Sequence, residues 1–600
     1  MENKLRSSVY QSVKDFLLSN VFGCLKNESY ILIVDNKTKE LINSTIGAFT
    51  LYENGCILIE HIESIRDEVH GVKALYFITP TSENLEMLYK DFGVLSQKFQ
   101  EGGCWDKFLY CGMKDLSVDT YLYDDLYIRF LGKVEEETLQ NLKQHKVIGK
   151  HLKDVDTLDI DVKLLEENLF SLDIQKSCVQ LFGRQFNNEL CLQIAKRLVE
   201  ICVVMDEDPV IRNKKGFPCE DIAKHFEQLM KDYKQSHTDH NFVNHGVLLL
   251  VDRSVDPLSP LLHDYTYQSL LMDVLPINDQ GEYKDGEKTY IFNREDTIYE
   301  HYKYMHILNT QSNIKTAYDK LIEYLDTQKN DISTLADLVK KLPEIRDQKD
   351  KLAIHFNMTK KCMTEFATKN LKAITEMEQN LCTACDDMGT VINREDDKIR
   401  LILLYCILYN VPDKEIRELI SLGKIQLLSF DDISNIKYMK IKTSEDFSLL
   451  VSQKEMATIA KKDRNNEVIK TRYISQIVDI LDLYLSGDLS RQEYEQRGNY
   501  PSVSIHTKIS SVRGAARNKR LFDGDTPSIH KEMAWYGLPE EKPHIMPGER
   551  VIVFVAGGIC YNELKQINSE GLKYNKNIII GTTEMLRAPD YIQQIKQLSE

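Results

Sequence analysis

No stretch of this chain is apolar for long enough to span a membrane. The longest apolar run, LILLYCILY (Leu401–Tyr409), has nine residues, whereas a membrane helix needs about twenty. The first residues, MENKLRSSVYQSVKDFLL, carry charges throughout and lack the apolar core of a secretory signal. We therefore expect a soluble, cytoplasmic protein that reaches a membrane only through a partner.

The chain also lacks an excess of positive charge. Its formal net charge is −16, and non-specific nucleic-acid binding needs Lys and Arg side chains to replace the counterions of phosphates. Attachment to an anionic membrane by charge alone is excluded on the same ground. Glycine and proline are scarce, with 27 and 14 copies in 600 residues, so long flexible linkers are not expected. A chain of this length should form about three to five domains, packed directly against one another.

Motifs that hold metals, phosphates or nucleophiles are missing. The thirteen cysteines are scattered, and the one close pair, Cys382 and Cys385, has no second pair to complete a zinc site of four ligands. The chain has no G-x-x-x-x-G-K-[ST], G-x-G-x-x-G, G-x-S-x-G or H-E-x-x-H sequence. The glycine turn AGGIC follows an apolar run and is a weak candidate for holding a phosphate. The sequence therefore predicts no metal and no cofactor.

Strand-length apolar runs alternate with helical patterns at both ends of the chain. YILIVD, GCILIE, ALYFIT, KFLYCG and YIRFL lie in the first part, and the last hundred residues contain RVIVFVAGGICYNELKQI and NIIIGTTEMLRAPDYIQQIKQL. The region that ends in GVLLLVD has the same alternation. Strands separated by helices predict mostly parallel sheets that are covered on both faces. The two later regions could be two domains or one sheet interrupted by an insertion.

The segment LLLVDRSVDPLSPLLHDYTYQSLLMDVLPI begins at Leu248 and follows the second α/β region. Asp252, Asp256, His263 and Asp264 could be drawn as an acid-base or metal cluster, because open α/β sheets hold ligands where strands end. Their spacing favours a structural interpretation: Asp256 satisfies loop amides, prolines fix the turn, and a helix that begins at His263 buries its apolar face. A sugar- or nucleotide-dependent transferase that uses Asp252 and AGGIC is the runner-up function.

The middle of the chain is mostly helical and contains an apolar heptad pattern. Two sets of apolar residues recur every seven positions, as in the a/d seam of a coiled coil. Pro343 lies inside the pattern, where proline removes a backbone donor and costs a helix about 3 kcal/mol or more. The seam either packs inside the protein or, in a hinged hairpin, is offered to another chain. The two sets are Leu335, Leu342, Phe356 and Met363, and Leu338, Ile345, Leu352 and Phe366.

Six segments resemble, in order along the chain, the Sec-one/Munc-eighteen (SM) family, whose members bind SNAREs in membrane fusion. The segment that begins at Leu248 is similar to the most recognisable one of the family. The others are ILIVDNKTKELINS with GCILIEHIESIRDEVHGVKALYFITPTSENLEMLYKDF, then LFSLD, TLADLVKKLPEIRDQKDKLAIHF, DDKIRLILLYCILYNV, and RVIVFVAGGICYNEL with IIIGTTEML. The pattern is most similar to the exocytic, syntaxin-binding branch.

The resemblance implies a fold class and domain limits. Family members are arch-shaped three-domain proteins with two parallel-sheet α/β domains and a large all-α insertion, and they are not enzymes. The second α/β domain is expected to be one sheet made from two separated parts. The implied limits are 1–137 for domain one, 138–263 and 490–600 for domain two, and 264–489 for domain three, with its hairpin near 331–369.

The resemblance also implies partners. A syntaxin-type SNARE is expected in the cleft between domains one and three, and a vesicle SNARE and the assembled SNARE bundle on the hairpin. The chain is expected to act as a monomer in exocytosis, recruited to the plasma membrane by syntaxin; the same family acts in Golgi or in endosomal and vacuolar fusion as the alternative. Expected syntaxin contacts are Asp35, Lys39, Glu60, Arg66, Tyr302, Lys303 and His306.

The remaining expected sites lie on the hairpin and on the outer face of domain one. Pro343 should bias the hairpin towards a bent form over an extended helix, and Phe356 should contact the vesicle SNARE. The short N-terminal peptide of syntaxin is expected near Leu109 and Tyr110. Relatives often carry a lysine where this chain has Gly47, which weakens the inference of tight binding to closed syntaxin. The full hairpin set is Leu335, Leu338, Leu342, Pro343, Ile345, Leu352 and Phe356.

Overall fold

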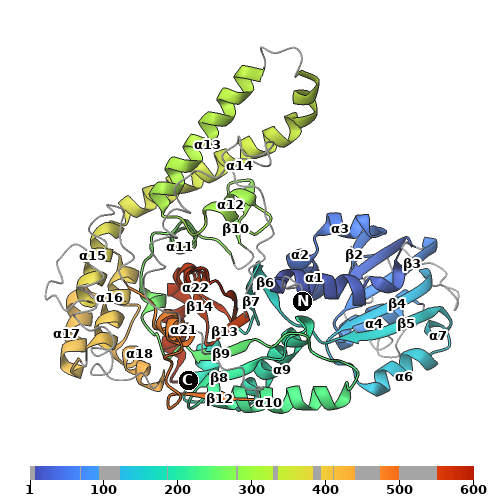
Figure 1. Ribbon diagram of the computed structural model, residues 1–600, viewed down its shortest axis with the longest axis horizontal. Helices are drawn as coiled ribbons and strands as arrows, with labels where there is room; N and C mark the ends of the chain where they lie inside the picture. Colours follow the sequence, from blue (N-terminus) through green and yellow to red (C-terminus); the bar gives the residue numbers. More distant parts are fainter. Residues whose placement is uncertain are drawn as a thin grey trace, which may run out of the picture.

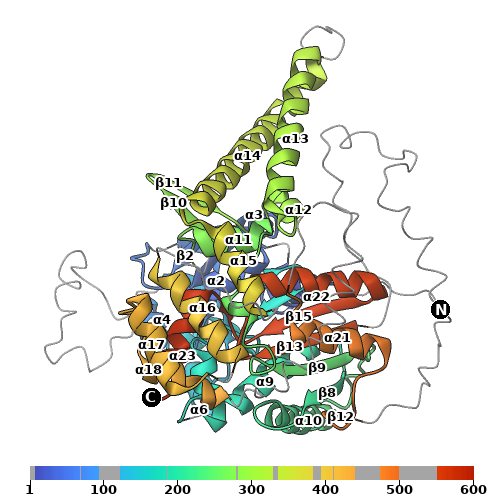
Figure 2. The ribbon, with the colours of Figure 1, turned by 90° about the vertical axis from the view of Figure 1, so that its left-hand side faces the viewer.

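The computed structural model describes residues 7–26, 28–67, 69–92, 122–185, 187–278, 281–328, 335–382, 394–409, 411–439, 473–498 and 550–600. Two α/β regions and a helical region are arranged as an arch, and a two-helix arm projects from the helical region (Figures 1 and 2). One predicted strand, KFLYCG at residues 107–112, lies outside the described residues.

The first region is a five-stranded parallel sheet in the order β2-β1-β3-β4-β5. The interior strand β1, which lies between β2 and β3, is buried along its whole length, as expected for a parallel sheet that is covered by helices on both faces. Its strands are β1 Tyr30–Val34, β2 Cys56–His61, β3 Val69–Ile78, β4 Tyr123–Leu131 and β5 Leu152–Leu158. Its helices are α1 Val9–Asn20, η1 Gly23–Leu25, α2 Asn36–Thr45, α3 Ala48–Glu53, α4 Ser82–Asp91, α6 Glu136–Gln144 and α7 Ile148–His151.

The first sheet extends past residue 137, where the sequence had placed the end of domain one. Strand β5 pairs in parallel with β4 and forms an edge of the sheet. Its sequence, LKDVDTL, is mostly exposed or half-buried. A strand with so little burial lacks the apolar run by which the other strands were recognised, and this is why the pattern missed it.

The second region is one sheet of seven strands built from distant parts of the chain, in the order β12-β8-β9-β13-β15-β7-β6. Strand β13 lies between β9 and β15, so Val551 pairs with Val247 on one side and Ile578 on the other. The two α/β stretches therefore share one interrupted sheet. Its strands are β6 Lys163–Glu166, β7 Leu169–Ser171, β8 Val210–Lys214, β9 Val247–Asp252, β12 Tyr494–Arg497, β13 Arg550–Ala556 and β15 Asn577–Thr582.

Helices cover both faces of the second sheet. Helix α21, which the sequence had placed in the helical domain, packs on this sheet, because Ile477 and Leu481 share an apolar cluster with Leu249 and Val551. The elements around the sheet are α8 Ser177–Phe182, α9 Asn188–Val204, α10 Cys219–Ser236, α21 Gln476–Ser486, β14 Ile559–Cys560, α22 Tyr561–Tyr574, β16 Met585–Leu586 and α23 Ala588–Gln597.

The helical region lies between β9 and α21 in sequence. A small antiparallel hairpin, β10 Glu282–Asp285 and β11 Lys288–Ile291, precedes its longer helices. Helices α13 and α14 run side by side and form the projecting arm (Figure 2). The other elements are η3 Ser259–Leu261, α11 Tyr267–Val274, α12 Thr297–Tyr302, α13 Ile307–Gln328, α14 Leu335–Thr368, α15 Leu371–Cys382, α16 Glu395–Leu408, α17 Asp413–Gly423, α18 Phe430–Ser434 and η4 Asn435–Met439.

The heptad seam of α14 packs against the protein itself over its described side chains. Ile345 and Leu352 are buried, and Phe356 is half-buried against the apolar cluster that also contains residues of α11 and α13. Pro343 is exposed and lies inside the helix. Figure 1 shows that α14 changes direction in the part nearest the tip of the arm, the end that carries Pro343; a proline is the usual cause of such a bend.

Candidate partner-binding groove

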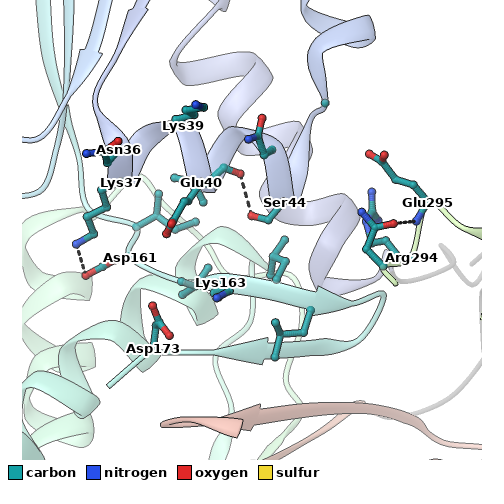
Figure 3. A pocket seen from close by; sticks show the side chains of 18 of the residues that line it. Asn36, Lys37, Lys39, Glu40, Ser44, Asp161, Lys163, Asp173, Arg294 and Glu295 are labelled. Carbon is teal, nitrogen blue, oxygen red and sulfur yellow. Dashed lines mark hydrogen bonds and ion pairs between the residues drawn. The ribbon is translucent and has the colours of Figure 1, made fainter. Parts of the chain in front are cut away.

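A groove of about 640 Å³ lies where three distant parts of the chain meet. One wall is helix α2, the floor is strand β6 with the residues before it, and the other wall is the segment from β11 towards α12 (Figure 3). No one of the three regions could form this groove alone. Its charged lining residues are Lys37, Lys39, Glu40, Asp161, Lys163, Asp173, Glu282, Arg294 and Glu295.

The groove carries charges of both signs, and part of this charge is unpaired. Lys37 Nζ pairs with Asp161 Oδ2 at 2.8 Å, which joins the wall to the floor. Lys39 is exposed, and its ammonium group makes no ion pair or hydrogen bond with any residue that the structure describes. An exposed ion pair is worth only about 0–1 kcal/mol. Charges of this kind therefore orient a bound partner more than they hold it.

Apolar side chains are exposed beside the groove. Gly47 and Ala48 line it, and the next residue of helix α3, Phe49, is 75% exposed. Tyr52 on the same helix is 53% exposed. On the opposite wall Ile291 lines the groove and is 50% exposed. Aromatic and aliphatic side chains left in water around a hollow are typical of a protein-binding surface.

Asp35, an expected syntaxin contact, is a structural cap. Its carboxylate begins α2 by accepting the Thr38 backbone N–H at 2.8 Å, and it accepts the Thr79 backbone N–H at 2.6 Å. Burial alone would raise the pKa of Asp35, but these hydrogen bonds outweigh burial and hold the pKa below its ordinary value. The side chain is buried, so it does not face the groove as expected. Of the four expected contacts in the first region, Lys39 lines the groove.

Arg66 and Glu60 also differ from the expectation of free charges in a cleft. Arg66 is buried, donates from Nη1 to the backbone carbonyls of residues 61 and 62, and pairs with Asp91. Glu60 is half-buried on β2, where its Oε2 lies 3.4 Å from the Tyr123 hydroxyl. Neither residue lines the groove.

The three expected contacts near α12 are mainly internal. Lys303 is buried, and its Nζ lies 2.7 Å from Glu166 and 2.8 Å from Glu300. Tyr302 is buried at the end of α12. His306 is half-buried, and its Nδ1 accepts the Leu308 backbone N–H at 3.2 Å.

Several expected positions lie outside the described residues. These are Leu109 and Tyr110, together with the side chains of Leu335, Leu338 and Leu342 on α14. Their proposed roles stay predictions.

Sequence patterns missed much of the groove. Lys37, Glu40 and Ser44 lie at helical spacing on α2 and line the groove beside Lys39. Recognising Asp35 as the N-cap would have predicted a helix from residue 36, and with it the helix face that carries these residues. Arg294 and Glu295 lie about 250 residues further on, and no local signal links them to α2.

The runner-up catalytic site is filled by the chain itself. Asp256 accepts the backbone N–H groups of Leu258 and Ser259 at 3.0 and 2.9 Å, which fulfils its predicted loop role. Asp252 is buried, and both its oxygens lie within 3.1 Å of Lys214 Nζ. The following helix begins at Tyr267, not at His263 as expected, because Asp264 instead accepts the Thr266 backbone N–H at 3.1 Å.

The AGGIC turn is closed as well. Glu563 accepts the Cys560 backbone N–H at 3.0 Å and pairs with buried Arg253 through two contacts of 2.8 Å. A side chain at Gly557 would approach Arg253 and Phe182 to 3.0 Å. An internal carboxylate thus takes the place at the start of α22 where a bound phosphate would lie. Glu584 likewise occupies the start of α8, where it accepts hydrogen bonds from the backbone N–H groups of Lys176 and Ser177 at 3.1 and 2.6 Å.

Within the described residues, no cluster of three or more His, Cys, Asp or Glu side chains is placed to hold a metal ion. Among the same residues, no helix combines the length and the apolar character that a membrane span requires.

The comparison with protein families decides the identity of the fold. The model of the Sec1 family matches residues 30–594. The chain belongs to the Sec1 family. This confirms the resemblance on which the expected architecture rested. A curated relative, protein transport protein sec1 of Dictyostelium discoideum, is 23% identical over 99% of this chain and 100% of its own length.

Solved structures of similar proteins support the same fold for this Sec1-family chain. The Unc18–syntaxin 1 complex of Monosiga brevicollis matches with a TM-score of 0.73 at 18% identity, over 99% of this chain and 100% of that one. The SM protein Vps45 in complex with the Qa SNARE Tlg2 matches with a TM-score of 0.72 at 17% identity, over 98% of each chain. The expected fold class, two parallel-sheet α/β domains with a large helical insertion, is therefore confirmed.

Proposed function

We propose that this protein binds a syntaxin-type SNARE in the groove between α2 and the segment before α12, and that it acts in vesicle docking and fusion. The observation that carries the proposal is the groove itself, which only the assembled arch creates and which combines unpaired Lys39 with exposed Phe49. Helical partners bind such surfaces by placing an apolar face against them. The Unc18 and Vps45 complexes with their SNAREs support the same partner class.

The projecting arm is proposed to template assembly with a vesicle SNARE. Helix α14 brings Pro343 to the exposed surface and leaves Phe356 half-buried. A half-buried aromatic can keep its inner contacts while its exposed part contacts a partner helix. The wider set of seam residues, from Leu335 to Leu352, is proposed to support this surface.

Exocytosis at the plasma membrane is the proposed trafficking step, with the protein recruited there by syntaxin and acting as a monomer. The relative named protein transport protein sec1 favours it. Golgi or endosomal fusion is the second candidate, favoured by the similarity to Vps45 with Tlg2. Pull-down from cytosol and membranes, with identification of the captured syntaxin, separates the two candidates.

The groove is tested with purified full-length chain and cytosolic fragments of syntaxin-type SNAREs. Lys39→Glu reverses the exposed charge, and Phe49→Ala removes exposed apolar area without touching the core. Each variant is expected to weaken binding about tenfold, which corresponds to about 1.4 kcal/mol. Lys143→Glu on α6 is the matched control and should bind like the natural chain. Unchanged affinity in both groove variants would refute the site.

A further inference from the structure

Two adjacent glutamates hold the helical region against the rest of the arch. Glu166 ends β6, and its carboxylate is buried. It accepts hydrogen bonds from Gln268 Nε2 at 2.8 Å, from Lys303 Nζ at 2.7 Å and from the Tyr304 hydroxyl. All three donors belong to the helical region, whereas Glu166 belongs to the second sheet. Burial opposes the charge of Glu166, but Lys303 outweighs it and lowers the pKa of this carboxyl.

The next residue, Glu167, reaches the first region as well. Its carboxylate accepts a hydrogen bond from the Ser8 hydroxyl, just before α1, and pairs with Arg294 Nη1 at 3.4 Å. Its backbone carbonyl accepts the Tyr10 N–H at 3.2 Å. The Arg294 guanidinium lies over the Tyr10 ring, and the Tyr10 hydroxyl donates to the carbonyl of Thr45, the last residue of α2. A chain of contacts thus connects α2 to Arg294 by way of Tyr10, and Glu167 contacts both Tyr10 and Arg294.

Both ends of this chain of contacts belong to the walls of the groove. Helix α2 forms one wall, and Arg294 lines the other. We infer that Glu166 and Glu167 form a clamp that fixes the helical region relative to α2 and thereby sets the width of the groove. They are positioning residues, and the effect of groove width on partner binding rests on the proposed function.

The two halves of the clamp differ in strength. Glu166 and Lys303 exclude water from a close pair, and their side chains are only 10% and 7% exposed. Glu167 is 46% exposed, and its contact with Arg294 is longer. Buried charge pairs are costly to break, whereas exposed pairs are weak. Substitutions at the Glu167–Arg294 pair should therefore change the angle of the arch without unfolding the protein.

The test measures how the helical region is placed relative to the first region in the full-length chain. Spin labels on genetically encoded amino acids at Lys143 on α6 and Glu323 on α13 report the distance between the first region and the arm by double electron–electron resonance. Glu167→Ala and Arg294→Ala are each expected to broaden and shift this distance distribution. The charge-exchanged double variant, Glu167→Arg with Arg294→Glu, should narrow it again. Glu137→Ala on α6 is the control and should leave it unchanged.

Partner binding supplies the second readout. The two single variants should bind a syntaxin-type SNARE fragment about tenfold more weakly, and the double variant should recover part of that loss. Natural distance distributions in both single variants would overturn the clamp. Altered distributions with natural affinity would uphold the clamp as a support of the arch and overturn its effect on partner binding. A natural chain that binds no SNARE fragment would refute the proposed function, while the distance measurement would still decide whether the two glutamates hold the arch.

Discussion

Charged residues of this protein often stabilise its own fold where a partner contact was expected. Asp35, Arg66 and Lys303 carry charges that suit a cleft, yet each is buried in a network of internal hydrogen bonds. For Asp35 the reason is geometric. The carboxyl ends of parallel strands are where helices begin, and a carboxylate there satisfies backbone N–H groups that have no other partner. The sequence shows where a charged residue is, but it does not show whether that charge is paired inside the fold or left free for a partner.

A residue-scale prediction concerns Glu200 on α9. Burial raises the pKa of this carboxyl from 4.5 to about 7, and Lys196 opposes the shift only in part. An acid with a raised folded pKa favours folding while it is protonated, so its cost appears as pH rises from about 4.5 and is complete above about 7. Glu200→Gln should therefore raise the stability of the protein at pH 8 by about 1–3 kcal/mol.

The same gain should disappear towards pH 5, where Glu200 is protonated in the folded protein. Melting temperatures of the natural chain and the variant, compared from pH 5 to 8.5, provide the measurement. Glu137→Gln on α6, where the side chain is exposed, is the control and should show no such trend. A gain from Glu200→Gln that is the same at every pH would contradict the assignment.

At the scale of elements, sequence patterns predict buried strands and long helices well. The runs around Ile33, Tyr76 and Ile128 became strands that are largely buried in the first sheet, as expected for a parallel sheet covered on both faces. The run around Leu58 became the edge strand β2, where Leu58 is exposed. Strand β5 was missed because it is a poorly buried edge. The heptads predicted a helix pair or a hinged hairpin near residues 331–369, whereas the structure has the single helix α14 there, with α13 as its partner in the arm. They did not predict the packing, since a seam that faces α11 and α13 has the same sequence as one that faces another protein.

The bend of α14 gives an element-scale prediction. Pro343 lacks the N–H that a helix interior uses and costs it about 3 kcal/mol, so Pro343→Ala should favour a straight, extended helix. We expect this variant to bind the vesicle SNARE more tightly and to stimulate fusion more strongly. Liposome fusion and vesicle-SNARE binding assays measure the two effects. Unchanged values in both would refute the idea that Pro343 controls a change between a bent and an extended helix.

Phe356→Ala is the comparison on the same helix. It should weaken vesicle-SNARE binding while syntaxin binding stays intact, because the groove lies on other elements. An equal loss of both would indicate misfolding through the apolar cluster that Phe356 joins.

At the scale of the whole molecule, the arch followed from a family resemblance and not from local patterns. Nothing near Val551 shows that it will lie beside Val247, and nothing near Arg294 shows that it will face α2 across a groove. Such contacts depend on how whole regions pack against one another, and a short window of sequence does not predict that packing. The domain limits at residues 137, 263 and 489 accordingly stay predictions, with β5 and α21 as the elements that fall on the other side of them.

The last prediction separates a SNARE-binding protein from a nucleotide-dependent enzyme at the same scale. A ligand that binds only the folded chain stabilises it by about 2.7 kcal/mol at a concentration of one hundred times Kd. A syntaxin cytosolic fragment should therefore raise the melting temperature, and Lys39→Glu should reduce that rise at equal concentration. Nucleotides and nucleotide sugars should leave it unchanged, because Glu563 and Glu584 already occupy the helix N-termini that a phosphate would use. A rise with nucleotides and none with any syntaxin fragment would overturn both the groove and the function proposed for it.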